Sequence, residues 1–310
     1  MSALICGSLA YDTIMVFPDR FKEHILPEKV HILNVCFMVP QMRREFGGCA
    51  GNIAYNLHLL GGDGYAMGTA GRDFDPYANW MDECGLDQRY IKKLDSEYTA
   101  QAFITTDLDN NQITTFHPGA MNGSHQTEVP TQAGISLAII SPDGKDGMQQ
   151  HAQQCAQAGI PFIFDPGQGL PMFNGEELLA FIEQASYVCV NDYESQLLQE
   201  RTGLTIEQIA KRVEAAIVTR GGEGSIIHVK GQSIDIPVVK ASAVQDPTGC
   251  GDAYRGGLLY GLMNNLDWEV TGRIAALMGA IKIEHDGTQN HSFTLAEFKD
   301  RYKQVYGDTF

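Results

Sequence analysis

Short apolar runs alternate with amphipathic segments along most of the chain. The apolar runs are continuous, which is typical of strands that are buried on both faces of a sheet. They lie at 3–6, 135–141, 160–165, 186–191 and 215–220. The segments between them have helical periodicity and lie at 52–62, 148–158, 175–185, 193–202, 205–214 and 253–262. This alternation predicts an α/β fold with a mostly parallel central sheet covered by helices on both faces.

Two stretches depart from the alternation, at 13–45 and 98–117. Both are typical of antiparallel strands, and the second has two strand-like arms around the turn-forming sequence DLDNNQ. We expect them to form a small β-sheet lid at one edge of a single domain that spans residues 1–310. Residues 30–39, VHILNVCFMV, are strand-like and too apolar for an exposed edge. They are therefore predicted to be covered by a helix, by the protein's own core or by a second copy of the chain.

Composition narrows the classes of function. The formal net charge is -16, and Arg43-Arg44 is the most basic stretch, which argues against a nucleic-acid partner. A phosphorylated ligand would need a local cradle of backbone N–H groups, a cation, or both. The seven cysteines form no C-x-x-C pair and no apolar run approaches 18 residues, so we expect reduced thiols, no membrane partner and a cytoplasmic protein.

The loops that follow the first predicted strands carry polar groups suited to a ligand. In an open parallel sheet, ligands bind beyond the carboxyl ends of the strands, where Ser8 and Asp12 follow the first strand. The loop at 46–52, FGGCAGN, has three glycines that permit close backbone approach, and Asn52 can both donate and accept hydrogen bonds. Such a loop suits ligand hydroxyls. The alternatives are a turn carboxylate at Asp12 and a helix cap at Asn52.

A second glycine-rich turn, DPTGCGD at 246–252, leads into an apolar helix. Its glycines allow backbone N–H groups to converge on an anion beside the carboxylate of Asp252. The alternative is that Asp252 is an ordinary helix cap. The chain contains neither a Walker A motif nor a strand followed by G-x-G-x-x-G, which disfavours P-loop and dinucleotide-binding folds.

Two further loops, NDYE at 191–194 and TRGGEGS at 219–225, also follow predicted strands. Asn191 and Glu194 are one helical turn apart and face the same edge of the sheet. Taken alone, each loop could be a cap or a turn. Four such loops at the ends of strands together favour phosphoryl transfer, with a hydroxyl substrate at the first loops and a nucleotide at the later ones.

The motifs GGCAGN and DPTGCGD, in this order and with NDYE between them, resemble the ribokinase-like (PfkB) carbohydrate and nucleoside kinases over essentially the whole chain. Within that family, GSLAYDTIMVFPDRF and TTFHPGAM look most like bacterial, mycobacterial-type adenosine kinases. The resemblance implies a ribokinase-like sheet with a β-lid, ATP as phosphoryl donor, Mg²⁺ and often a stimulating monovalent cation such as K⁺. It also implies ATP-dependent phosphorylation of a nucleoside 5′-hydroxyl, with adenosine as the expected substrate.

The same resemblance assigns a role to each candidate residue. Asp252 would be the base that takes the proton from the 5′-hydroxyl. The anion hole for the transferring phosphoryl group would consist of Gly249, Cys250 and Gly251. The nucleoside would be bound by Ser8, Asp12, Gly48, Asn52, Phe116 and Gln168. ATP would be bound by Asn191, Thr219, Arg220, Gly221, Gly222, Gly224 and Gly251. Glu194 would organise Mg²⁺ through water, and the monovalent-cation loop would include Asp246, Thr248 and Gly287.

Three positions depart from the family pattern. The usual D-T-x-G-A-G-D is present here with Pro247 and Cys250. Proline fixes one turn dihedral and a thiol is little larger than a methyl group, so neither is expected to disturb the anion hole. Phe103 is one position away from the base-stacking Phe of the most similar relatives, and in a strand this offset turns the ring to the other face.

Two alternatives to adenosine kinase stay open. One is another ribokinase-like kinase that acts on a free sugar or on inosine or guanosine. The other is a non-catalytic nucleoside sensor, against which Asp252 and Glu194 argue, because binding alone needs no base. The resemblance also suggests a homodimer in which lid sheets of two chains pack about a twofold axis.

Overall fold

The computed structural model describes residues 1–26, 31–32, 34–109 and 111–310. Its larger sheet has nine strands, parallel from β11 through to β5, with an antiparallel hairpin at the other edge. In spatial order these strands are β13 (Gln232–Ile236), β12 (Ser225–Val229), β11 (Ala215–Thr219), β10 (Tyr187–Asn191), β9 (Phe162–Phe164), β8 (Ile135–Ile140), β1 (Ser2–Cys6), β4 (Asp63–Gly71) and β5 (Tyr90–Leu94). The expected mostly parallel ribokinase-like sheet is confirmed.

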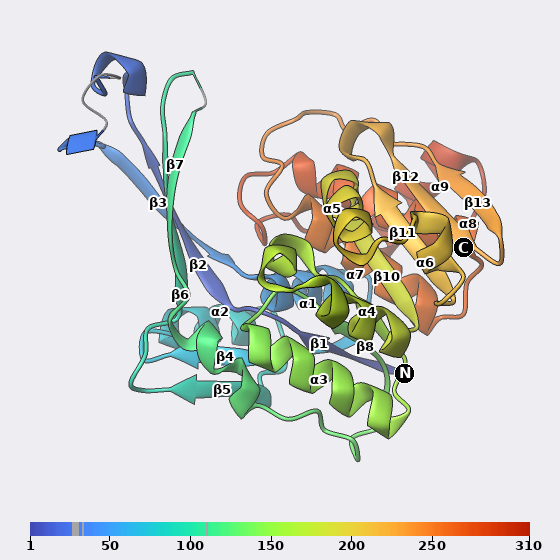
Figure 1. The fold of residues 1–310 in the computed structure, drawn as a ribbon. Coiled ribbons are helices and arrows are strands. Elements are labelled where there is room, and N and C mark those ends of the chain that lie inside the picture. The colour runs from blue at the N-terminus through green and yellow to red at the C-terminus, as the bar shows by residue number, and fades with distance from the viewer. Residues whose placement is uncertain (27–30, 33, 110) are drawn as a thin grey trace.

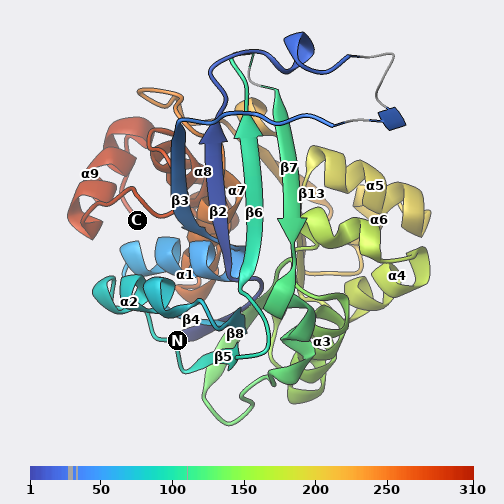
Figure 2. The ribbon, with the colours of Figure 1, turned by 90° about the vertical axis from the view of Figure 1, so that its left-hand side faces the viewer.

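Helices cover both faces of this sheet, as Figures 1 and 2 show. Alternate residues of β1 point to opposite faces: Ala3 and Ile5 pack into one apolar cluster, and Leu4 and Cys6 into another. The first layer and its flank contain α1 (Cys49–Leu59), α2 (Asp75–Glu83), α7 (Cys250–Met263), α8 (Trp268–Ile283) and α9 (Leu295–Tyr306). The second contains α3 (Lys145–Ala158), α4 (Gly175–Gln184), α5 (Asp192–Thr202) and α6 (Ile206–Ala210).

A separate four-stranded sheet stands out from the body of the molecule and is seen face-on in Figure 2. Its strands, in spatial order, are β3 (Gln41–Gly47), β2 (Ala10–Val16), β6 (Ala100–Thr106) and β7 (Gln112–His117). We call this sheet the lid. β2 pairs in parallel with β6, whereas the other two pairings are antiparallel. The sequence pattern predicted only antiparallel strands here, because alternation within a strand carries no information about the direction of its neighbour.

The prediction of a strand over 30–39 is wrong for residues 34–39, which have no regular structure; residues 30 and 33 lie outside the described residues. Of the apolar side chains here, Phe37 packs locally, whereas Val35 and Met38 are exposed. The ring of Phe37 contacts Phe17 and Phe21, with centroids 4.8 and 4.9 Å apart. This cluster buries Phe37 partly and accounts for that residue alone.

Two further differences concern the edge of the central sheet. The β12–β13 hairpin was not expected from the alternating pattern, although it completes the sheet. The helix predicted over 205–214 ends at Ala210, and its last residues form a turn that leads into β11. Among the described residues, no helix is both long and apolar enough to span a membrane.

Candidate active site

The anion-hole turn ends in the first turn of α7. The helix begins after Gly249, which has a left-handed backbone (φ 79°) and whose Cβ, if present, would lie 3.0 Å from Thr288. Cys250, Gly251 and Asp252 are the first three residues of the helix, so their backbone N–H groups have no intrahelical partners. Because the cap residue is Gly249, the alternative in which Asp252 caps the helix is wrong. The Cys250 N–H donates to the Pro247 backbone oxygen at 3.2 Å, whereas the Gly251 and Asp252 amides, at the positive end of the helix dipole, can face an anion.

A chain of amides holds the carboxylate of Asp252. Asn52 Nδ2 donates to Asp252 Oδ2 at 2.8 Å, and Gln289 Nε2 in turn donates to Asn52 Oδ1 at 2.9 Å. Asn52 is buried in α1, whose cap is Gly48, so the alternative of Asn52 as a helix cap is also wrong. Gln289 fixes the Asn52 amide so that its NH₂ faces the carboxylate.

The environment of Asp252 tunes its basicity. Burial raises the pKa of Asp252 to about 6, while the hydrogen bond from Asn52 and the charge of Arg255 act to lower it. Asp165 and Asp12 add to the upward shift. A carboxylate with a pKa in this range is ionised at neutral pH and is a stronger base than an ordinary aspartate.

Asp12 was expected in a loop after β1, but it lies in strand β2 of the lid. It is directly opposite Glu45 of β3 in the register of the sheet. Burial, reinforced by the neighbouring carboxylates of Asp246 and Glu45, raises the pKa of Asp12 to about 6. The charge of Asp12, on the lid, also raises the pKa of Asp252.

The loop before α1 brings its backbone close to the loop after β1. Gly48 has φ 86°, and a Cβ there would lie 2.5 Å from the carbonyl oxygen of Ser8. The Oγ of Ser8 accepts a hydrogen bond from the Cys49 amide at 3.2 Å. Glycine is required at position 48 because both the dihedral and the space exclude a side chain. Ser8 joins the two loops, and its hydroxyl is already engaged.

The register of the lid places Phe103 and Phe116 on opposite faces. Asp12 is opposite Ala102 of β6, which is opposite Phe116 of β7, so these three side chains share one face. Phe103 is opposite Thr13 and is on the other face. Half of the Phe116 side chain is exposed. Of the two rings, Phe116 is the one that can reach a ligand held by Asp12. Gln168 lies exposed in the short helix Gly167–Met172.

The residues expected to bind nucleotide form local caps and turns. Asn191 is the cap of α5, and its side chain accepts from the Glu194 amide at 2.7 Å. The Glu194 carboxylate accepts from the Asn191 backbone N–H at 2.8 Å. This is a capping box, so the capping interpretation of the pair holds. Burial raises the pKa of Glu194.

The loop 219–224 follows β11 and is open on one side. A Cβ at Gly221 or Gly222 would contact nothing within 4 Å, whereas one at Gly224 would collide with the carbonyl oxygen of Ile236. The first two glycines, in a short 3-10 turn at Gly221–Glu223, thus leave the backbone accessible. Thr219 and Arg220 are half-buried, and Arg220 donates to Asp235 Oδ1 at 2.7 Å.

The expected monovalent-cation loop is tied by hydrogen bonds. Asp246 Oδ1 accepts from the Thr248 amide and Oδ2 from the Gly287 amide, each at 2.9 Å. Both oxygens of this carboxylate therefore hold backbone groups of two loops. No cluster of three or more His, Cys, Asp or Glu side chains suited to a metal ion is found among residues 1–26, 31–32, 34–109 and 111–310.

Sequence reasoning missed three buried polar residues near the site. Asp165 and Arg255 form a two-pronged ion pair (2.6 and 2.7 Å) beneath the helix start, and Arg255 Nη1 also donates to the Gly251 carbonyl. Lys282 of α8 donates from Nζ to the backbone oxygens of Asp246 and His285. The only signal in the sequence for Arg255 and Lys282 is that each is an isolated charge within a mostly apolar helix. Local pattern does not show what such a charge contacts.

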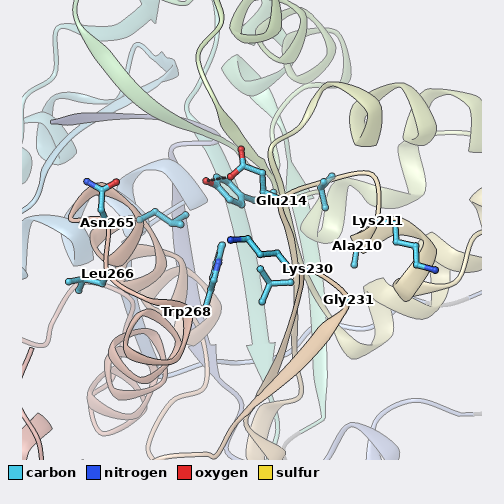
Figure 3. Close-up of a pocket in the computed structure, with 12 residues that line it drawn as sticks. Ala210, Lys211, Glu214, Lys230, Gly231, Asn265, Leu266 and Trp268 are labelled. Carbon is cyan, nitrogen blue, oxygen red and sulfur yellow. Dashed lines mark hydrogen bonds between the residues drawn. The ribbon is translucent and has the colours of Figure 1, made fainter.

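A pronounced pocket lies at the other end of the sheet. Figure 3 shows its lining, which includes Lys211 after α6, the β12–β13 turn at Lys230, and Trp268 at the start of α8. Tyr187, at the amino end of β10, also lines it. The pocket is thus at the amino ends of the strands, whereas the candidate site is at their carboxyl ends. None of the expected site residues lines it.

Comparison with known proteins gave matches over most of the chain. A profile of pfkB family carbohydrate kinases matches residues 9–294. A nucleoside kinase of Methanocaldococcus jannaschii is 31% identical over 89% of this chain and 92% of its own. The structure of a Burkholderia thailandensis nucleoside kinase in complex with inosine is 54% identical, covers 99% of both chains and superposes with a TM-score of 0.91. An adenosine kinase of Sinorhizobium meliloti, at 21% identity and a TM-score of 0.77, shares the fold.

Proposed function

The chain belongs to the pfkB family of carbohydrate kinases, and on that premise we propose that it transfers the terminal phosphoryl group of ATP to the 5′-hydroxyl of a nucleoside. It is a phosphotransferase with an alcohol group as acceptor. The observation that carries the proposal is the Asp252 carboxylate, oriented by Asn52 beside the amino-terminal amides of α7. A base next to an anion-binding helix start is the arrangement that phosphoryl transfer to a hydroxyl needs.

The residues divide the chemical work between them. Asp252 accepts the proton as the 5′-oxygen attacks the γ-phosphorus, and the bond from that phosphorus to the ADP oxygen breaks. The amides of Cys250 and Gly251 receive the charge on the phosphoryl oxygens. Asp12, with Gly48 and Asn52, binds the ribose hydroxyls. A lid strand thereby supplies one ribose contact and the core supplies the others.

ATP is proposed to lie over the loop 219–224, with Asn191 and Glu194 near its phosphates. A relative from Burkholderia thailandensis, 56% identical, has been solved with ADP and inosine. Mg²⁺ would lower the charge of the phosphates. Glu194 fits a role through water, because its carboxylate already accepts from Asn191 and is not part of a cluster of metal ligands. Since ATP is its cosubstrate, we also propose that the protein acts in the cytoplasm.

The proposed substrate is a purine nucleoside, with adenosine expected and inosine as the second candidate. The inosine complex of the relative with 54% identity supports the latter. Ala102 is on the same lid face as Asp12, at the position where a base-stacking phenylalanine would lie. Phe116 is on this face too, and it is therefore the proposed aromatic contact. A small residue here leaves room for more than one base.

A panel of substrates tests this function. With ATP and Mg²⁺, we expect turnover of adenosine or inosine and much slower turnover of free ribose and fructose, measured by ADP release. Faster turnover of a free sugar would favour the carbohydrate-kinase alternative. Tight nucleoside binding without ADP release would favour the sensor.

We further propose that two lids pack together in a homodimer. Met42 and Ile113 lie on the lid face opposite to Asp12 and are 69% and 42% exposed, and their side chains form a row with Met15 and Thr105 across all four strands. A second copy would bury this row about a twofold axis.

Light scattering at micromolar concentration checks the assembly. The wild type should be a dimer, and Met42→Glu or Ile113→Glu should shift it toward the monomer, because a charge opposes burial of this row. Val244→Glu is the control, since Val244 is exposed outside the lid. A wild-type mass of 34.0 kDa would exclude the dimer.

A further inference from the structure

The side chain of Lys282 is completely buried although it carries an ammonium group. It lies near the end of α8 and has no exposed surface. Its Nζ donates to the backbone oxygen of Asp246 at 2.7 Å and to that of His285 at 3.1 Å. A buried lysine is stable only when hydrogen bonds and opposite charges replace water. Here backbone carbonyl oxygens provide that replacement.

The two carbonyls belong to the two loops that border the anion hole. Asp246 opens the turn that ends in the first residues of α7, and His285 opens the loop that contains Gly287 and Thr288. The loops are joined a second time, since the Asp246 carboxylate accepts from the Gly287 amide at 2.9 Å. Thr288 lies against Gly249, the cap of α7. Lys282 is therefore at the junction that sets the position of the anion-hole amides.

The chain itself places two basic side chains, Lys282 and Arg43, at this junction. Burial lowers the pKa of Lys282, and the charge of Asp246 raises it. From the lid, Arg43 approaches Asp246 Oδ2 and Asp286 Oδ1, each at 3.6 Å. Asp246 thus has Lys282 at its backbone oxygen and Arg43 near its carboxylate.

A monovalent cation does not fit this junction. Backbone carbonyl oxygens are the groups that coordinate such an ion, and those of Asp246 and His285 are occupied by Nζ. A potassium ion beside the ammonium would add a like charge at short range in a buried environment. The expectation of a K⁺ site at Asp246, Thr248 and Gly287 therefore disagrees with the residues present.

We propose that the ammonium of Lys282 takes the place of a monovalent cation, holding the Asp246 and His285 loops so that the α7 amides face the transferring phosphoryl group without K⁺. This proposal rests on the proposed kinase function. Lys282 is a positioning residue, because it contacts the two loops and not the substrate. Its charge also reaches the anion hole, since it lowers the pKa of Cys250, although burial raises that pKa overall.

Cation dependence tests the proposal in solution. Wild-type kcat should be the same in potassium, sodium and choline chloride at equal ionic strength. Lys282→Ala should lower kcat at least about 10-fold in choline chloride with little change in KM, and K⁺ or NH₄⁺ should restore part of it by occupying the vacated space. Lys240→Ala, which removes an exposed lysine, should match the wild type in every salt.

Three kinetic results would overturn it: a wild-type kcat that rises severalfold with K⁺, a Lys282→Ala variant as active as the wild type without K⁺, or a folded variant that neither K⁺ nor NH₄⁺ restores. Rubidium soaked into wild-type crystals gives an answer that needs neither activity nor a folded variant. No anomalous peak should lie between the Asp246 and His285 carbonyls, and a peak there contradicts the proposal. Absence of phosphorylation in every salt would refute the kinase function, leaving the rubidium result to decide the role of Lys282.

Discussion

Replacing Asp252 with asparagine should lower turnover by at least about 100-fold while nucleoside and ATP binding change little. The amide keeps the shape of the side chain and can still contact Asn52, but it cannot accept the 5′-hydroxyl proton. The position at the start of α7 motivates this prediction, because there the carboxylate lies beside the amides that are proposed to bind the phosphoryl group. Steady-state kinetics and calorimetric titration measure the two effects separately.

The pH profile identifies the group. The pKa of Asp252 is raised to about 6, and its ionised form is the base. Wild-type kcat/KM should therefore decrease as the pH is lowered below about 6. Asp12 has a similarly raised pKa, so Asp12→Asn is the control and should keep the acid limb, moved to lower pH because the Asp12 charge raises the pKa of Asp252. Asp252→Asn should lose it. An Asp252→Asn variant with more than about a tenth of wild-type turnover would contradict its role as base.

Removing the ribose contact of Asp12 should have the second largest effect. Asp12→Ala should lower kcat/KM for the nucleoside by at least about 100-fold, because a site built to pair with hydroxyls depends on each partner. The wild type should likewise use 2′-deoxyadenosine and 3′-deoxyadenosine far less well than adenosine. In the variant this discrimination should largely disappear for the hydroxyl that Asp12 binds, which separates lost contact from general damage.

Equal use of adenosine and both deoxynucleosides by the wild type would show that Asp12 and Asn52 do not bind the ribose. A variant that is slow on all of them but still discriminates would place Asp12 in support of the lid and not at the hydroxyls. Thermal melting of Asp12→Ala distinguishes either outcome from unfolding.

Local pattern predicted the central sheet because each strand that is buried on both faces is a short, continuous run of apolar residues. The run around Ala3 to Cys6 is apolar at every position, and both faces of β1 are covered. Periodicity also predicted correctly that the one-position offset turns Phe103 away from the face where a stacking ring would lie, and Phe103 is on the face opposite to Asp12. Glycine-rich loops identified Gly48 and Gly249 because only positive backbone angles and close contacts make glycine necessary.

What local pattern could not supply is pairing across the chain. Asn52 meets Asp252 across 200 positions, and Gln289 meets Asn52 across 237, so no window of sequence contains either contact. The strand prediction for 34–39 was wrong for a related reason, because apolar residues in sequence do not indicate which part of the protein would cover them. Asp12 was expected in a loop because its strand belongs to the lid, whose direction relative to the core depends on tertiary packing.

The most direct test of the account is the identity of the product. Adenosine and inosine, each incubated with ATP, Mg²⁺ and the wild-type protein, should give a monophosphate whose phosphorus-31 signal couples to the two protons on the 5′ carbon. Asp252→Asn should give almost none in the same time. A phosphate on the 2′- or 3′-oxygen, or phosphorylation of a free sugar in place of either nucleoside, would contradict the proposed reaction.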